Sequence, residues 1–156
     1  MSACTPYPAA VAELIQFYET LRPESLARLP ALYAPDARFK DPFNDVQGVD
    51  AVQRIMEHLF DALQQPRFRV LSCVAQGQQA FVTWDFEFAL PRLRNGQTQR
   101  IHGATHWALD AAGRVTLHRD YWDAAEELYE KLPILGALMR TLKAALRTPQ
   151  KPEPAR

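Results

Sequence analysis

The last strand-like run of the chain closes with His118-Arg119-Asp120-Tyr121-Trp122-Asp123, after an alternating stretch that starts at Val115. Successive side chains of a strand point to opposite faces, so His118, Asp120 and Trp122 share one face. A carboxylate between an imidazole and an indole suits the wall of an apolar pocket that handles a proton. A solvated, ion-paired strand end would carry the same pattern, and spacing alone leaves both interpretations open.

The length and composition predict one soluble globular domain. The chain has 156 residues, of which 47% are hydrophobic and 23% are charged, as is ordinary for a single folded domain. Lys and Arg together number 18, as do Asp and Glu, so no global field would attract nucleic acid. The sequence shows neither a signal-peptide pattern nor an uncharged apolar stretch of about 18 residues, so we expect a cytoplasmic protein.

No sequence pattern predicts a metal or a cofactor. The two cysteines, Cys4 and Cys73, form neither a disulfide framework nor a C-x-x-C spacing. The four histidines lack the paired spacing of a metal site, and the sequence has no glycine-rich phosphate loop. We therefore expect a site that is made of protein side chains only.

Apolar residues at helical spacing predict three helices in the first half of the chain. The first covers residues 11–21, and the third opens with a glycine and covers residues 48–63. Between them, Ser25 can cap a shorter helix that Pro30 should shorten or kink. Residues 37–42 predict a short strand that a proline stops.

From residue 67 onward the hydrophobic period changes to two, which predicts strands. The four strands are expected over residues 68–75, 80–90, 99–110 and 114–122. A final helix is expected over residues 124–147. We therefore expect a single domain over residues 9–147, with a flexible lead at 1–8 and a disordered tail at 148–156.

Helices followed by a run of strands indicate an α+β fold, with three helices packed in a strongly curved antiparallel sheet and an extra C-terminal helix. A sheet that helices close on one side leaves a conical cavity, where a ligand can bind. The C-terminal helix is amphipathic, with Arg140, Lys143 and Arg147 between its leucines. Such a helix can touch a membrane surface, but we favour packing over the pocket mouth or against a partner subunit.

The order of these elements and two motifs resemble the SnoaL-like branch of the nuclear transport factor 2 superfamily. The motifs are Tyr33-Ala34-Pro35-Asp36-Ala37-Arg38-Phe39-Lys40-Asp41-Pro42-Phe43 with the downstream Gly48, and Asp120-Tyr121-Trp122-Asp123. The resemblance covers roughly residues 10–130 and implies a cystatin-like, cone-shaped α+β fold. It also implies a homodimer, because family members commonly pair through the outer face of the sheet. The fold hosts isomerases, hydrolases, cyclases, adaptors and carriers, so the activity stays open.

The resemblance to ketosteroid isomerases of this fold is incomplete. Their general base matches Asp41. Their oxyanion-binding tyrosine on the first helix matches Phe17, with Tyr18 expected to point elsewhere, and their second oxyanion donor matches Thr105. Because only one of the three groups is present, we do not expect Δ5-ketosteroid isomerase activity.

The resemblance to limonene epoxide hydrolases and to SnoaL-type cyclases centres on Asp120. In the hydrolases a water-activating aspartate occupies the matching position, but their Arg-x-Asp partner corresponds here to Gly-Ala-Thr, ending at Thr105. The cyclases use a histidine with an aspartate, and His102, His106 and His118 are the candidates. If Thr105 faces the pocket, strand alternation turns the first two histidines outward and leaves the third.

The resulting hypothesis is a domain that binds an apolar small molecule and carries acid/base chemistry of the isomerase, cyclase or hydrolase type. The alternative is a non-catalytic carrier of the same fold. The candidate catalytic residues are Asp41, His118 and Asp120. The candidate ligand-contacting residues are Phe17, Tyr33, Phe39, Thr105, Trp107 and Trp122. Asp41 also fits a turn-capping role, and the aromatic residues also fit a plain core.

Overall fold

The computed structural model describes residues 7–89 and 96–127. The chain divides into two compact units, and the second begins at Asp123. Of the second unit, the structure describes Asp123 and the short helix α4 (Ala124–Glu127). The carboxylate of Asp123, which precedes the helix, accepts the backbone N–H of Glu126 at 3.1 Å. The rest of the helix expected over 124–147, the tail and residues 1–6 lie outside the described residues. No helix in the described ranges is long and apolar enough to cross a membrane.

Helical segments precede the strands, as the periodicity predicts. Helix α1 spans Ala9–Glu19 and helix α3 spans Val49–Ala62. The expected second helix is instead a 3-10 segment, η1 (Pro23–Arg28), followed by one α-helical turn, α2 (Leu29–Leu32). Pro30 lies in the first turn of α2. Backbone N–H groups in the first turn of a helix have no partner within the helix, so the missing N–H of proline costs no hydrogen bond there. The structure therefore has two short segments in place of one kinked helix.

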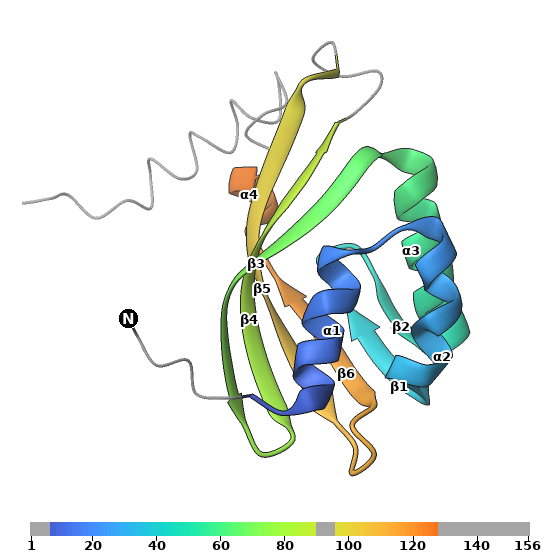
Figure 1. Ribbon diagram of the computed structural model, residues 1–156. Helices are drawn as coiled ribbons and strands as arrows, with labels where there is room; N and C mark the ends of the chain where they lie inside the picture. Colours follow the sequence, from blue (N-terminus) through green and yellow to red (C-terminus); the bar gives the residue numbers. More distant parts are fainter. Residues whose placement is uncertain (1–6, 90–95, 128–156) are drawn as a thin grey trace, which may run out of the picture. The chain divides into compact units, whose positions relative to one another are not determined.

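Six strands form one sheet in the order β2-β1-β6-β5-β4-β3 (Figure 1). They are β1 (Tyr33–Lys40), β2 (Asp45–Gln47), β3 (Gln64–Gln76), β4 (Gln79–Ala89), β5 (Thr98–Leu109) and β6 (Val115–Tyr121). The α+β class and the four consecutive antiparallel strands β3–β6 are confirmed. The expectation of a wholly antiparallel sheet is wrong, because β1 pairs with β6 in parallel. Nearly half of the chain separates these two strands, so no hairpin dictates their relative direction.

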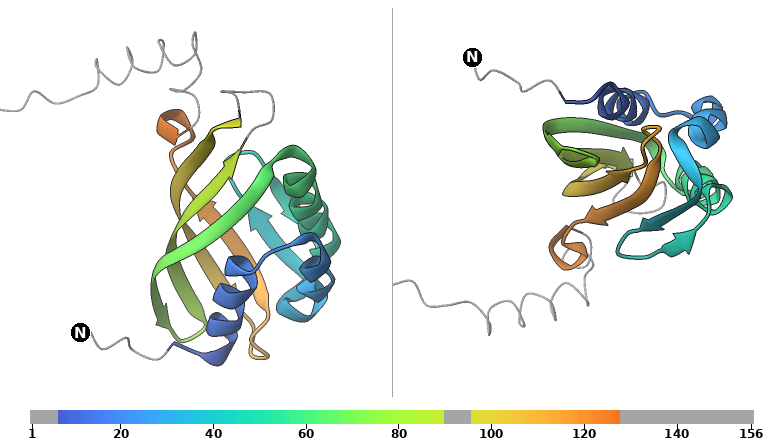
Figure 2. Two further views of the ribbon diagram at one scale, coloured as in Figure 1. Left: turned by 45° about the horizontal axis from the view of Figure 1, so that its top comes forward. Right: turned by 90° about the horizontal axis from the view of Figure 1, so that it is seen from below.

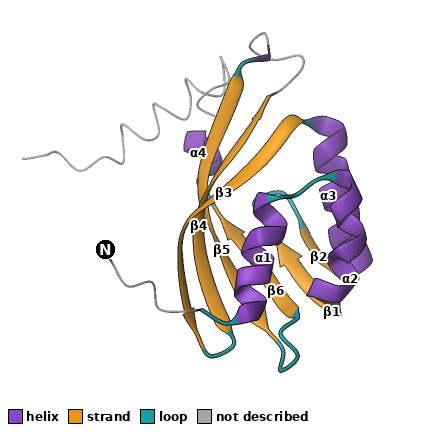
Figure 3. Ribbon diagram, viewed as in Figure 1, coloured by secondary structure: helices purple, strands orange, loops and turns teal. Residues whose placement is uncertain are grey.

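The sheet bends strongly, and α1 and α3 lie on its inner side (Figures 2 and 3). A register shift in β3 between Val70 and Ser72 marks an irregularity of the kind that bends a strand. Strand β4 presents Val82 and Trp84 to the buried inner side, whereas Phe81 is exposed on the outer side. The inner face of the sheet and the helices thus enclose the core of the first unit.

Gly48 sets the start of α3. Its φ of +101° is a backbone conformation that side chains disfavour, and its N–H donates to the carbonyl of Ala37 at 2.8 Å. This bond ties the entry of the helix to β1. The apolar stripe of α3 then buries Val52 and Met56 against the core, so the helix forms one wall of the space that the sheet encloses.

Candidate functional site

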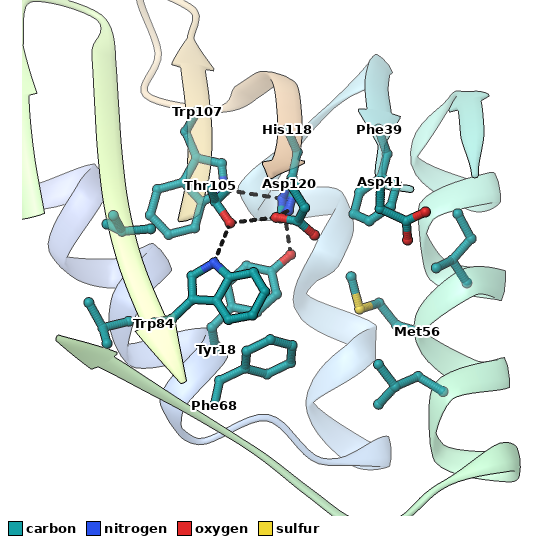
Figure 4. A pocket seen from close by; sticks show the side chains of 14 residues that line it. Tyr18, Phe39, Asp41, Met56, Phe68, Trp84, Thr105, Trp107, His118 and Asp120 are labelled. Carbon is teal, nitrogen blue, oxygen red and sulfur yellow. Dashed lines mark hydrogen bonds and ion pairs between the residues drawn. The ribbon is translucent and has the colours of Figure 1, made fainter. Parts of the chain in front are cut away.

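A partly enclosed cavity lies between the inner face of the sheet and α3 (Figure 4). Its volume is about 70 Å³, several times the ~10–15 Å³ that one water molecule requires. Aromatic and aliphatic side chains from α3 and the strands make up most of the lining. The polar side chains in the lining are Tyr18, Asp41, Thr105, His118 and Asp120.

Asp120 is the polar group at the centre of this lining. Its Oδ1 accepts a hydrogen bond from Nε2 of His118 at 2.9 Å and another from the hydroxyl of Thr105 at 2.5 Å. The sheet dictates both contacts, because His118 lies two residues away on the same face of β6 and Thr105 is the cross-strand partner of Asp120. The second carboxylate oxygen, Oδ2, accepts no hydrogen bond from the described residues. Figure 4 shows it directed into the open space.

The hydroxyl of Thr105 can serve Asp120 only as a donor. The indole N–H of Trp84 donates to the Thr105 oxygen at 2.8 Å. An indole nitrogen has no acceptor capacity, so the hydroxyl hydrogen of Thr105 is directed away from Trp84 and toward Asp120. Trp84 therefore orients a group that in turn orients the carboxylate.

The contacts of His118 fix its tautomer. The indole N–H of Trp107 points at Nδ1 of His118 from 3.1 Å. Because this indole can only donate, Nδ1 must carry the lone pair, and the ring hydrogen resides on Nε2. His118 is 2% exposed and packs against the ring of Phe39 at a centroid distance of 4.6 Å. The imidazole is thus a tightly held donor to Asp120.

Two buried tyrosines complete the network behind His118. The hydroxyl of Tyr33 lies 2.7 Å from Nδ1 of His118, and the hydroxyl of Tyr18 lies 2.5 Å from that of Tyr33. Burial raises the pKa of both phenols well above the usual value, so both stay protonated. With Tyr33 donating to His118, Tyr18 donates to Tyr33. The hydrogen bonds therefore run in one direction: Tyr18 donates to Tyr33, Tyr33 donates to His118, and His118 donates to Asp120.

Asp41 also lines the cavity, but its carboxylate serves the turn that follows β1. Its Oδ1 accepts the backbone N–H groups of Phe43 at 2.7 Å and Asn44 at 2.6 Å. The side-chain amide of Asn44 reaches both carboxylate oxygens, at 3.1 and 3.0 Å. These bonds are those of the turn-capping interpretation.

The structure brings some of the candidate residues together and leaves others out. Phe39, Thr105 and Trp107 line the cavity with the three candidate catalytic residues. Phe17 does not line it: its side chain is fully buried in the core, and Tyr18 occupies the place expected for it. The expectation that Tyr18 points elsewhere is wrong, because both residues lie within the buried stripe of α1 and periodicity cannot separate neighbours within such a stripe.

Tyr33 and Trp122 are also absent from the cavity lining. Tyr33 is fully buried, and its hydroxyl donates a hydrogen bond to Nδ1 of His118, on the side of the ring away from Asp120. Trp122 follows the end of β6, where strand alternation no longer applies, and packs edge-to-face on Phe43 at 5.5 Å. The sequence did not indicate the hydrogen-bonding role of Trp84; its only signal was its place on the apolar face of β4.

The other two strand histidines face away from the cavity, as alternation from Thr105 predicts. His102 contacts Asp85 at 3.0 Å on the outer face, and His106 stacks on Phe81 with ring centroids 4.4 Å apart. Within residues 7–89 and 96–127, no three His, Cys, Asp or Glu side chains form a group that could hold a metal ion.

The fold has many relatives among solved structures. An LEH-like epoxide hydrolase of M. tuberculosis is 15% identical, covers 85% of this chain and 92% of its own, and has a TM-score of 0.62. A protein of Shewanella putrefaciens assigned as a SnoaL-like polyketide cyclase is 19% identical, with 79% and 98% covered and a TM-score of 0.64. A protein of Catenulispora acidiphila with a ketosteroid isomerase-like fold, in complex with trimethylamine, is 13% identical, with 79% and 92% covered and a TM-score of 0.66. At these identities the likeness concerns the fold alone.

Sequence comparison is more specific about the family. No curated protein matches the chain. The family model described as the SnoaL-like domain matches residues 14–118, a range that includes α3, β3, β4 and β5 and reaches His118. The chain therefore belongs to the SnoaL-like domain family, within the nuclear transport factor 2-like α+β fold.

Proposed function

We propose that the domain binds an apolar small molecule in its cavity and that Asp120 acts on this molecule as a general base. The observation that carries the proposal is the convergence of two hydrogen-bond donors on Oδ1 of Asp120. This arrangement leaves Oδ2 free of described partners and directed into an apolar space. A base needs a fixed orientation toward the proton that it removes, and the two donors supply that orientation.

In this proposal Thr105 and His118 position the carboxylate. The donor that loses its proton to Oδ2 is a group of the bound molecule, or a water beside it that attacks the molecule. The apolar lining strengthens the electrostatic interaction by excluding bulk water. Asp41 has a smaller part, because the turn after β1 already occupies its carboxylate.

The test begins with native mass spectrometry of the purified protein, which identifies the molecule that it carries. This molecule is then incubated with the wild type, with Asp120→Asn and with Asp45→Asn. Asp45→Asn removes a carboxylate that is paired with Arg38 outside the cavity, so it controls for the change in net charge. We expect the wild type and the control to form product, and Asp120→Asn to bind the molecule without converting it. Conversion by Asp120→Asn at the wild-type rate would refute the role of general base.

A carrier without catalysis is the alternative, and one observation favours it. The hydroxyl hydrogens of Tyr18 and Tyr33 are directed along the network to His118, so neither of these described phenols offers an acid to the cavity opposite Asp120. A carrier would return its ligand unchanged, and its affinity would depend on the cavity wall at Trp107 more than on either aspartate. The incubation above distinguishes the two functions.

A cytoplasmic homodimer is part of the proposal. The outer face of the sheet exposes Val74 and Phe81, which are 70% and 52% exposed and are cross-strand partners. Adjacent exposed apolar side chains on a sheet favour association. A second copy of the chain, packed on this face, would cover them.

A further inference from the structure

The described side chains that line the cavity offer a ligand a hydrogen-bond acceptor and no free donor. The indoles of Trp84 and Trp107 donate to Thr105 and His118. The hydroxyl of Thr105 and Nε2 of His118 both donate to Asp120. The remaining hydroxyl, that of Tyr18, donates to Tyr33, so every side-chain donor of the described lining is already in use. A ligand must therefore bring its own donor to meet Oδ2 of Asp120.

The acceptor also carries a charge that no described neighbour in the lining balances. The described residues of the lining include no Lys or Arg, and Nδ1 of His118 accepts the indole N–H of Trp107. Described cations that adjoin lining residues on β1 and β6 contact other groups: Arg38 and Lys40 pair with Asp45, and Arg119 lies over the ring of Tyr121. An ionised carboxylate in an apolar cavity is costly unless a partner of opposite charge joins it.

The walls beside Asp120 suit a cation as well. The side chains of Phe39 and Trp84 line the same cavity as Asp120, and Figure 4 draws them among the side chains that surround it. The face of an aromatic ring attracts a positive charge, most strongly where water is excluded. A cationic group at Oδ2 would meet both the carboxylate and these rings.

We infer that the molecule bound in the cavity is a small apolar amine, held as its ammonium form with an N–H donated to Oδ2 of Asp120. Its hydrocarbon part packs against the α3 wall at Ile55 and Leu59. The inference rests on the part of the proposed function that places a small molecule in the cavity, and it names the class of that molecule. An oxyanion or a carbonyl oxygen would find no free donor among the described lining side chains.

Four probes with one carbon skeleton test this inference: cyclopentylamine, cyclopentanol, cyclopentanone and cyclopentanecarboxylate. Titration is followed by NMR through the indole N–H signals of the three tryptophans. Trp84 and Trp107 line the cavity, whereas Trp122 does not and reports on binding elsewhere. We expect the amine to bind most tightly, the alcohol next, and the ketone and the carboxylate about 10- to 100-fold more weakly than the amine, as the loss of a charge-assisted hydrogen bond implies.

Asp120→Asn should weaken binding of the amine by a similar factor, because the amide keeps the shape and loses the charge. Asp45→Asn, the matched loss of one charge outside the cavity, should leave it unchanged. Equal or tighter binding of the ketone or the carboxylate would overturn the amine inference and leave the cavity site standing. The amine inference would also be overturned if Asp120→Asn bound the amine as tightly as the wild type does. If no probe shifts the cavity tryptophans, the proposed cavity site fails as well. Should Asp120→Asn not fold, the wild-type ranking decides alone.

Discussion

Gly103 should control the candidate site without touching a ligand. It lies opposite Trp84 across strands β4 and β5. A methyl group at this position would lie 2.4 Å from Cη2, 2.6 Å from Cζ2 and 2.9 Å from Cζ3 of the Trp84 indole. Ordinary contacts between carbon atoms measure about 3.5–4.0 Å, so Gly103→Ala must displace the indole. The displaced indole would no longer reach Thr105, which holds Asp120.

The expected cost of Gly103→Ala follows from these distances. Overpacking of a core typically costs about 1–3 kcal/mol, and the lost hydrogen bond between Trp84 and Thr105 about 0.5–1.5 kcal/mol. The better strand conformation of alanine offsets about 0.5–1 kcal/mol. We therefore expect the free energy of unfolding to fall by about 2 kcal/mol, within the range that single substitutions usually cause.

Urea denaturation of Gly103→Ala in two backgrounds provides the assay. Trp84→Leu lacks the three ring atoms that clash, so Gly103→Ala should be neutral or slightly stabilising in that background. The coupling free energy between the two positions should then be about 2 kcal/mol. An equal cost in both backgrounds, or stabilisation of the wild type by Gly103→Ala, would refute the packing argument and the orienting role given to Trp84.

Three further outcomes are expected. Thr105→Val leaves the Trp84 N–H without an acceptor and should cost about 1–3 kcal/mol in urea denaturation, whereas Thr105→Ser, which keeps the hydroxyl, should cost clearly less. Hydrogen bonds from Arg38, and then from Lys40, lower the pKa of Asp45 from 3.8 to about 2. Asp45 therefore stabilises the fold above about pH 4 and loses this contribution as the pH falls toward 2, so the difference in urea midpoint between the wild type and Asp45→Asn should vanish there. Light scattering should show a dimer for the wild type and a monomer for Phe81→Lys; a monomeric wild type would contradict the proposed pairing.

The elements that sequence predicted best are those with a long, clear period. Helix α3 carries an apolar residue at almost every expected position of its stripe, and β3–β6 alternate over seven residues or more. Strand β2 has three residues, too few for any period to appear. The parallel pairing of β1 with β6 depends on contacts far apart in the chain, which local patterns do not carry.

The candidate site was predictable to the level of strand faces and no further. Strand alternation correctly predicted that His118 and Asp120 face the cavity and that His102 and His106 lie on the outer face. It could not predict that the tautomer of His118 is fixed by Trp107, because that contact depends on the register between β5 and β6. It failed for Trp122, which lies one residue beyond the end of the strand.

A crystal structure with the molecule identified by mass spectrometry would test the central claim, that Oδ2 of Asp120 acts on the bound molecule, most directly. We expect the hydrocarbon part of the molecule in the cavity and a hydrogen-bond donor about 3 Å from Oδ2. The bonds from Thr105 and His118 to Oδ1 should be unchanged. A molecule on the outer face of the sheet, or one whose polar group meets Asp41 and leaves Oδ2 without a partner, would contradict the claim.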